Sequence, residues 1–190
     1  LDDQPALRGL SVLGVDADRF ATVELRAAAH DSRRLVPGDL FCCVRGRLHD
    51  GHDHAAAAVA AGAAALLVER PLDLGVPELV VRDVRRAMGP VAAVLLGDPS
   101  ATLDVVGVTG TNGKTTTTHL LAAVLNRAGR NCGVIGTLGW GFPGKLADTG
   151  HTTPDPVTMQ RALASLGEQG AKLVAVEVSS HALKQGRTRS

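Results

Sequence analysis

Aromatic residues are scarce in this sequence: they make up 2% of its 190 residues, with one tryptophan and no tyrosine. Proteins that bind single-stranded nucleic acids stack the bases on aromatic side chains, so this composition offers few stacking platforms. The 20 basic and 19 acidic residues nearly cancel, which leaves no broad basic surface for a phosphate backbone. We therefore expect no nucleic-acid partner.

Cysteine is scarce as well, with three residues at Cys42, Cys43 and Cys132. An odd number, with two of them adjacent on an apolar run, favours free thiols in a reducing cytosol over a disulfide framework. We expect Cys42 and Cys43 to be small core residues. No stretch of the sequence is long and apolar enough to cross a membrane, and we recognise no signal peptide at its start. We expect a cytoplasmic monomer without a membrane partner.

Hydrophobic residues make up 45% of the chain, which is ample for a core, and the length allows one large domain or two small ones. Strand-like and helix-like segments alternate, which predicts the α/β class with a mainly parallel sheet. The turn cluster Gly97–Ser100 predicts a boundary between a small α/β domain at residues 1–99 and the start of a second α/β domain at residues 100–190.

The hydrophobic pattern also predicts individual elements. The expected strands span residues 40–44, 65–68, 78–81, 104–109, 132–137 and 173–178. The expected helices span residues 55–61, 84–96 and 115–128. A fourth helix begins at Asp155-Pro156, which is a good cap and first-turn pair. Between Gly139 and Gly150 we expect a glycine-rich loop.

Residues 109–116, Thr-Gly-Thr-Asn-Gly-Lys-Thr-Thr, carry the clearest functional signal. They follow the apolar run Val105–Val108, which we interpret as a buried strand. They lead into a helix on which Leu120, Leu121, Val124 and Leu125 are spaced like one face. A strand, a glycine-rich turn and a helix form a phosphate-binding loop, in which backbone N–H groups and the helix N-terminus hold phosphate oxygens.

Two side chains of this loop suit a nucleotide. Lys114 would neutralise the outer phosphates, and Thr115 would offer its hydroxyl to a phosphate-bound Mg²⁺. The usual glycine spacing fails, because Val108 stands where the first glycine belongs and Gly107 and Gly110 flank it. We interpret the stretch as a variant loop; the alternative is a glycine-rich turn with a stray lysine.

The apolar strand at residues 173–178 carries one acid, Glu177, near its C-terminal end. A buried carboxylate needs a cation or hydrogen-bond donors. Ligands of open α/β sheets bind at the carboxyl ends of strands, where the phosphate-binding loop also lies. We therefore expect Glu177 to hold Mg²⁺, directly or through water. The alternative is a solvated or ion-paired Glu177 on a surface strand.

Four groups of residues, taken together, resemble the Mur ligases of peptidoglycan synthesis, specifically the type that adds the third residue of the stem peptide. They are Asp31-Ser32-Arg33 with Pro37–Phe41; Asp50–Asp53; Thr109–Thr116; and Thr152–Asp155 with Glu177–Leu183. They span nearly the whole chain from residue 30 onward. The sister ligase, which adds D-Ala-D-Ala, shares the first two groups and a similar phosphate-binding loop. The last group and Gly136–Gly139 look like the third-residue type.

The resemblance implies an ATP-dependent acid–amino-acid ligase. In this family, ATP phosphorylates the terminal carboxylate of UDP-N-acetylmuramoyl-L-alanyl-D-glutamate to give an acyl phosphate. The amine of diaminopimelate or lysine then attacks and forms an amide. ATP and Mg²⁺ would be the cofactors. Because the reactants carry much negative charge, catalysis would depend on positioning and on charge neutralisation by Mg²⁺, Lys114 and the loop amides.

The resemblance also implies roles for individual residues. Lys114 and Glu177 would be catalytic, and Thr115 and Glu177 would bind magnesium. ATP would contact Gly110, Thr111, Asn112, Gly113, Lys114, Thr115 and Thr116. The UDP part of the substrate would contact His30, Ser32, Arg47, Leu48 and His49 in the first domain. The muramoyl-peptide part would contact Thr152, Thr153, Ser179, Gln185 and Arg187, whose guanidinium suits a carboxylate or phosphate.

Simpler interpretations exist for several of these residues. Thr152 and Thr153 could cap the following helix, and Ser179-Ser180 could be an ordinary strand-to-turn transition. His49, His52 and His54 together suggest a metal site, but turn residues dominate that stretch and the family has a similar turn without a metal. His181 is interpreted as structural.

The family continues beyond Arg187 through the rest of the ATP-binding sheet and a further domain that binds the incoming amino acid. We therefore expect this chain to correspond to the N-terminal part of a ligase. We expect it to bind the UDP-sugar, to bind ATP weakly, and not to complete the ligation alone. An incomplete sheet would expose an edge and lower solubility. The alternatives are the D-Ala-D-Ala-adding ligase and a non-catalytic UDP-sugar-binding module, which would be indifferent to Lys114→Ala.

Overall fold

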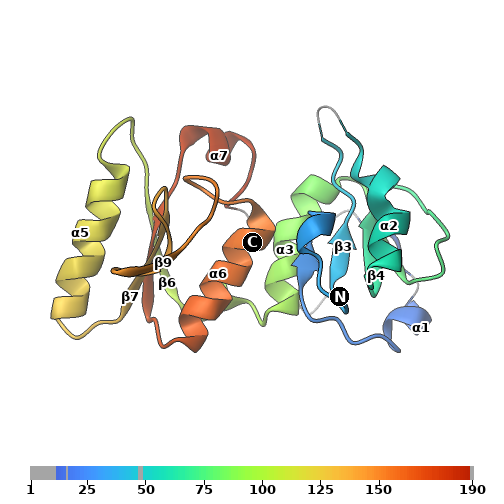
Figure 1. The fold of residues 1–190 in the computed structure, drawn as a ribbon, viewed down its shortest axis with the longest axis horizontal. Coiled ribbons are helices and arrows are strands. Elements are labelled where there is room, and N and C mark those ends of the chain that lie inside the picture. The colour runs from blue at the N-terminus through green and yellow to red at the C-terminus, as the bar shows by residue number, and fades with distance from the viewer. Residues whose placement is uncertain (1–11, 16, 47–48, 189–190) are drawn as a thin grey trace. The chain divides into compact units, whose positions relative to one another are not determined.

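The structure is a computed structural model that describes residues 12–15, 17–46 and 49–188. It divides into two compact units, Leu1–Leu95 and Leu96–Ser190, and each contains its own five-stranded sheet (Figure 1). Helices accompany both sheets, so the expected α/β class is confirmed. None of the helices in the described ranges is long and apolar enough to cross a membrane.

The sheet of the first unit has the strand order β1-β5-β4-β3-β2. Its strands are β1 (Val12–Val15), β2 (Ala28–Ala29), β3 (Leu40–Cys42), β4 (Ala65–Val68) and β5 (Glu78–Val81). The helices are α1 (Ala17–Phe20), α2 (Ala55–Ala60) and α3 (Val84–Leu95), with 3-10 turns at Ser32–Arg34 and Gly51–His54. Strands β2 to β5 pair in parallel, and β1 pairs antiparallel with β5.

The expected strands at 65–68 and 78–81 are confirmed with the same bounds, and the expected strand at 40–44 ends at Cys42. Residues Phe41, Leu66 and Val68 pack with the small residues of α2 into one hydrophobic cluster. This packing explains how an alanine-rich helix without large apolar anchors holds its place: Ala55 and Ala58 are fully buried against the sheet. The two short strands β1 and β2 were not predicted.

All three cysteines are buried and free, as the sequence predicted. Burial raises the pKa of the Cys43 thiol to about 12 and also raises the pKa of Cys132. Since the thiolate is the reactive form, we expect the native chain to react very slowly with iodoacetamide. Its labelling should not rise between about pH 7 and about pH 9, where an exposed thiol ionises. Mass spectrometry with and without urea would measure this; rapid labelling of the native chain would contradict the burial.

The sheet of the second unit has the strand order β6-β10-β7-β8-β9. Its strands are β6 (Asp104–Val108), β7 (Cys132–Gly136), β8 (Gly139–Phe142), β9 (Lys145–Ala147) and β10 (Leu173–Glu177). Its helices are α4 (Pro99–Thr102), α5 (Lys114–Arg127), α6 (Pro156–Glu168) and α7 (Ser180–Lys184). Strand β10 pairs in parallel with β6 and β7, whereas β8 and β9 continue the sheet antiparallel. Figure 1 shows α5 and α6 on opposite faces of this sheet.

The expected glycine-rich loop from Gly139 to Gly150 is wrong. Residues 139–147 form the β8–β9 hairpin, whose turn at Pro143-Gly144 has Gly144 at φ 93°. Proline followed by a glycine with positive φ is the sequence of a type II turn. Trp140 and Phe142 alternate along β8 and pack partly buried against the core beside α6. The glycines therefore belong to a strand that carries large side chains at alternate positions.

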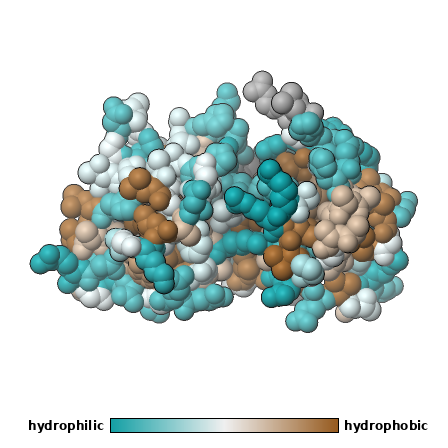
Figure 2. Space-filling model, in the orientation of Figure 1, coloured by the Kyte–Doolittle hydropathy of each residue, from teal (hydrophilic) through white to brown (hydrophobic). Residues whose placement is uncertain are grey.

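The expected burial of Val105–Val108 is also wrong. Strand β6 is the first strand in the order of its sheet, and the side chains of Val105 and Val106 are 43% and 39% exposed. The helix that follows is likewise only half as expected, because Leu121 and Leu125 pack toward the sheet while Leu120 and Val124 are exposed. Figure 2 shows hydrophobic surface on the side of this unit where α5 lies. The buried residues of α5 are Thr118 and Ala122. At about 100° per residue, the buried face therefore lies beside Leu121 and Leu125 and turns Leu120 and Val124 away from the sheet.

Candidate functional site

The polar residues expected to bind ligand in the second unit gather where β6, β10 and β7 end. These strands run in parallel, and the register pairs Glu177 with Val108 and Val176 with Ile135. The loop after β6, the end of β10 and the turn after β7 therefore emerge at the same edge of the sheet. In α/β proteins this edge is where ligands bind.

The loop after β6 presents an exposed backbone in front of α5. Gly110, Thr111, Asn112 and Gly113 are all exposed. Helix α5 begins at Lys114, and its N-cap residue Gly113 provides no side-chain hydrogen bond to the first turn. The N–H groups of that turn lack a capping side chain and suit an anion. The Lys114 ammonium donates to the Gly110 carbonyl over 2.8 Å, so a cation already lies against the loop.

Glu177 lies at the end of β10 with 1% of its surface exposed. Its Oε2 accepts hydrogen bonds from the Thr115 hydroxyl at 2.8 Å and from the Thr137 hydroxyl at 3.1 Å. Its Oε1 accepts from the backbone N–H of Thr137 at 2.9 Å. The alternative of a solvated Glu177 is wrong, because β10 lies between β6 and β7. The described partners of this buried carboxylate are hydroxyl and amide groups rather than a basic side chain.

Gly136 makes room for this carboxylate. A Cβ atom at residue 136 would lie 2.1 Å from Oε1 of Glu177 and 2.6 Å from its Cδ. Any side chain at this position would therefore displace Glu177. Because residue 136 has no side chain, the Glu177 carboxylate has room to point toward Thr115 and Thr137.

The pair of Thr115 and Glu177 fits a magnesium ion. Octahedral Mg²⁺ with bonds of about 2.0–2.1 Å holds neighbouring ligand oxygens about 2.9 Å apart, and these two oxygens are 2.8 Å apart. Within the described ranges, no group of three or more His, Cys, Asp or Glu side chains could hold a metal. Mg²⁺ usually takes only one or two protein ligands and completes its shell with water and phosphate oxygens.

Thr152 and Thr153, in the segment before α6, bond to residues around the Glu177 carboxylate rather than to the carboxylate itself. The Thr152 hydroxyl lies 3.0 Å from the Thr137 hydroxyl. The Thr153 hydroxyl, which is buried, donates to the backbone carbonyl of Glu177 at 2.8 Å and accepts from the N–H of Ser179 at 3.0 Å. The interpretation of these threonines as caps of α6 is wrong, because the side chain of Asp155 caps that helix.

The remaining residues expected to hold the muramoyl-peptide part lie on and after α7. Ser179 caps α7 by accepting from the N–H of Ala182. The Arg187 guanidinium donates to Gln185 Oε1 at 2.8 Å and to the carbonyl of Thr153 at 2.9 Å. The structure therefore joins Thr153, Ser179, Gln185 and Arg187 in one connected group. His181 is exposed on α7 beside Gln185.

In the first unit, His30 and Ser32 lie on the segment directly after β2, on either side of Asp31. The carboxylate of Asp31 accepts from the N–H and the guanidinium of Arg33, which orders the short 3-10 turn containing Ser32. The Arg33 side chain lowers the pKa of Asp31 to about 2. His49 is exposed, and Arg47 and Leu48 lie outside the described residues.

The metal interpretation of the nearby histidines is excluded for His52 by its hydrogen bonds. Its Nδ1 lies 2.6 Å from Asp50 Oδ1, and its Nε2 accepts from the backbone N–H of Glu69 at 2.9 Å. With Nε2 accepting, Nδ1 carries the proton donated to Asp50, and no lone pair remains for a metal. The His52 side chain is completely buried, and its two hydrogen bonds join the segment around Asp50 to the segment around Glu69.

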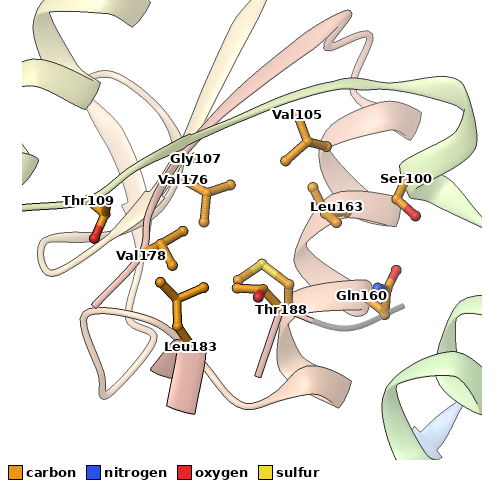
Figure 3. A pocket seen from close by; sticks show the side chains of 11 residues that line it. Ser100, Val105, Gly107, Thr109, Gln160, Leu163, Val176, Val178, Leu183 and Thr188 are labelled. Atoms are coloured by element: carbon orange, nitrogen blue, oxygen red, sulfur yellow. The ribbon is translucent and has the colours of Figure 1, made fainter. Parts of the chain in front are cut away.

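A pocket of about 540 Å³ lies on the α6 face of the second sheet (Figure 3). Its walls are mostly apolar and include Val105, Leu163 and Val176. Glu177 follows Val176 on the strand and points to the opposite face, because neighbouring side chains alternate. Of the described residues that line the pocket, none is charged, and most of its walls are apolar. The pocket lies on the opposite face of the sheet from the Thr115–Glu177 site.

Thr137 is the site residue that sequence reasoning missed. Both its N–H and its hydroxyl bond to Glu177, and its hydroxyl also reaches Thr152. The available signal was its position as the last residue of the expected strand at 132–137, next to a glycine. Polar residues at the carboxyl ends of neighbouring parallel strands meet at one edge.

Comparisons with known proteins agree on one family. The model of the Mur ligase middle domain matches residues 108–190, and the model of the Mur ligase family catalytic domain matches residues 24–101. A relative from Halalkalibacterium halodurans, named UDP-N-acetylmuramoyl-L-alanyl-D-glutamate–2,6-diaminopimelate ligase, is 48% identical over 159 residues. That match covers 84% of this chain and 33% of the relative.

Solved structures agree with this result. A structure of a UDP-N-acetylmuramoyl-L-alanyl-D-glutamate–2,6-diaminopimelate ligase matches with a TM-score of 0.72 and 36% identity, over 87% of this chain and 34% of that one. The MurF ligase from Thermotoga maritima in complex with ADP matches with a TM-score of 0.54 and 26% identity, over 82% of this chain and 32% of that one. The chain thus spans about a third of the length of the relatives that it matches.

Proposed function

The chain belongs to the Mur ligase family, and from this premise we propose that it forms the UDP-sugar-binding and ATP-binding part of a ligase of peptidoglycan synthesis. The proposed reaction joins an amino acid to the terminal carboxylate of UDP-N-acetylmuramoyl-L-alanyl-D-glutamate at the expense of ATP. The printed names of the similar relatives make 2,6-diaminopimelate the amino acid that we propose.

The observation that carries this proposal is the meeting of Thr115 and Glu177 beside the phosphate-binding loop. Thr115 follows Lys114 on the first turn of α5, and its hydroxyl lies 2.8 Å from Glu177. A cation, an open helix N-terminus and a pair of oxygen ligands thus lie within one short segment and the strand end beside it. Triphosphates with Mg²⁺ require this combination of groups.

Each residue of the loop has a defined task in this proposal. Gly110–Gly113 and the start of α5 would direct N–H groups at the phosphates, and Lys114 would exchange its bond to the Gly110 carbonyl for phosphate oxygens. Thr115 and Glu177 would hold Mg²⁺, which when bound neutralises the charge that develops on the transferred phosphoryl group. The protein's contribution is therefore to position the reactants and to balance their charge.

The second half of the proposed site would hold the muramoyl-peptide. Thr152, Thr153, Ser179, Gln185 and Arg187 are joined to one another or to the Glu177 network by hydrogen bonds. Arg187 would bind a carboxylate of the peptide, because a guanidinium pairs with it through two parallel hydrogen bonds. In the first unit, His30, Ser32, Arg47, Leu48 and His49 would contact the UDP part.

Calorimetric titration of the 190-residue chain would test the proposal. The ligands are UDP-N-acetylmuramoyl-L-Ala-D-Glu and the corresponding tripeptide form, and circular dichroism confirms that the sample is folded. We expect the dipeptide form to bind more tightly, by about tenfold or more, which corresponds to about 1.4 kcal/mol. The tripeptide already carries the residue that the reaction adds, so a site for the dipeptide substrate does not need to accommodate this third residue.

Other outcomes of this titration would point elsewhere. Preference for the tripeptide form would favour the D-Ala-D-Ala-adding ligase, a type named for a similar structure from Acinetobacter baumannii. Binding of the UDP part with the same affinity in a Lys114→Ala variant, and without any nucleotide binding, would favour a non-catalytic UDP-sugar-binding module. A folded chain that binds neither form would contradict the proposed function.

A further inference from the structure

Three hydroxyl groups and one carboxylate form a continuous series of hydrogen bonds across the site, the hydroxyl chain. The Thr115 hydroxyl bonds to Glu177 at 2.8 Å, Glu177 bonds to the Thr137 hydroxyl at 3.1 Å, and the Thr137 hydroxyl lies 3.0 Å from that of Thr152. One end of the hydroxyl chain, Thr115, lies on the proposed nucleotide side, and the other end, Thr152, lies on the proposed peptide side. Thr137 is the link between the two sides and has no assigned role.

The direction of these hydrogen bonds follows from counting protons. A hydroxyl has one proton, and an ionised carboxylate only accepts. Thr115 and Thr137 must therefore both donate to Glu177 Oε2 when that carboxylate is ionised. Thr137 then has no proton left for Thr152, so the Thr152 hydroxyl donates to Thr137. In this state the hydroxyl proton of Thr152 points to Thr137 and is not available to a ligand.

We propose that Thr137 is a positioning residue that couples nucleotide binding to peptide binding by reversing this hydroxyl chain. The inference rests on the proposed function, because it needs Mg²⁺ at Glu177 and the peptide at Thr152. A metal at Glu177 Oε2 uses the lone pairs that now accept from the threonines. The Thr137 hydroxyl then rotates and donates to Thr152, whose own proton becomes available to an anionic peptide group.

The position of Thr137 suits such a rotation. Its backbone N–H keeps the bond to Glu177 Oε1, so the residue stays in place while its hydroxyl turns. The side chain lies in the exposed turn between β7 and β8, and its Oγ1 is within hydrogen-bond distance of both alternative partners. A hydroxyl that also accepts a hydrogen bond is a stronger donor, so each reversal reinforces the next bond.

The test measures coupling between ligands rather than turnover. Calorimetry gives the dissociation constant of UDP-N-acetylmuramoyl-L-Ala-D-Glu with and without a saturating non-hydrolysable ATP analogue and Mg²⁺. The 190-residue chain is compared with Thr137→Val, which removes the hydroxyl at nearly constant shape, and with Thr137→Ser, which keeps it. Thr149→Val is the matched control, because Thr149 bonds to the Gly136 and His151 carbonyls but not to Glu177 or Thr152.

We expect the nucleotide to tighten dipeptide binding by about fivefold or more in the unchanged chain, the lower range of known coupling between sites. Thr137→Ser and Thr149→Val should keep this ratio, and Thr137→Val should bring it close to one while both ligands still bind. An unchanged ratio in Thr137→Val, or no coupling in the unchanged chain, would overturn the proposal. Failure of the unchanged chain to bind either ligand would instead refute the proposed function, and the coupling with it.

Discussion

Gly136→Ala is expected to abolish the contribution of Mg²⁺ to nucleotide binding and to destabilise the second unit. The new Cβ would lie 2.1 Å from Glu177 Oε1 and 2.7 Å from its Cγ, and Glu177 has no free space into which to move because it is 1% exposed. The carboxylate must leave Thr115 and the Thr137 N–H. Overpacking of this kind costs about 1–3 kcal/mol of unfolding free energy. Calorimetry of ATP binding with and without Mg²⁺, together with urea denaturation, would measure both effects.

Gly167→Ala is the matched control for this variant. Gly167 lies in α6, and a Cβ there would be 3.8 Å from the nearest side-chain atoms of Leu103, an ordinary contact. Alanine is favoured over glycine inside a helix by about 1 kcal/mol, so this variant should be at least as stable as the unchanged chain and bind nucleotide normally. Retention of the Mg²⁺ effect in Gly136→Ala would show that Glu177 does not act through the position seen here.

Lys114→Ala is expected to weaken ATP binding by roughly 10- to 150-fold. A hydrogen bond to a charged group contributes about 1.5–3 kcal/mol, and each 1.4 kcal/mol is a factor of ten in the dissociation constant. Folding should change little, because the partners of the Lys114 ammonium in the described part of the chain are carbonyls of its own exposed loop, those of Gly110 and Thr111. Titration with ATP and Mg²⁺ at fixed salt concentration gives the affinity.

Lys172→Ala controls for the loss of a positive charge, because Lys172 is exposed on the segment before β10. The variant should bind ATP as the unchanged chain does. Equal affinities for Lys114→Ala and Lys172→Ala would mean that the loop after β6 does not hold the phosphates. The proposed ATP-binding site would then have no lysine that binds the phosphates, and a module that binds only the UDP-sugar would be the better interpretation.

The features that were predictable from the sequence depend on short stretches of the chain. Glycines, Lys114 and Thr115 between an apolar run and a helix predicted the loop after β6, and the Asp155-Pro156 pair predicted the start of α6 to the residue. In both cases neighbouring residues determine the backbone conformation. The β8–β9 hairpin was predictable in the same way from Pro143-Gly144, but the many glycines around it suggested a loop.

The features that were missed depend on partners distant in sequence. Thr137 and Glu177 are 40 residues apart, and their contact requires β7 and β10 to be neighbours in the sheet. Val105 and Val106 suggest a buried strand by composition. They are exposed because β6 is the first strand in the order of its sheet. Hydrophobic periodicity identifies a strand but does not give its place in a sheet.

Trp140 gives the second unit of this chain an optical signal of its own. It is the only tryptophan, the chain has no tyrosine, and it lies on β8 in the second unit, three residues after Thr137. Indole fluorescence therefore reports on the second unit alone, whereas circular dichroism reports on both. Melting curves recorded with the two signals resolve the stabilities of the units without an added label. A ligand that shifts only the dichroism curve stabilises the first unit.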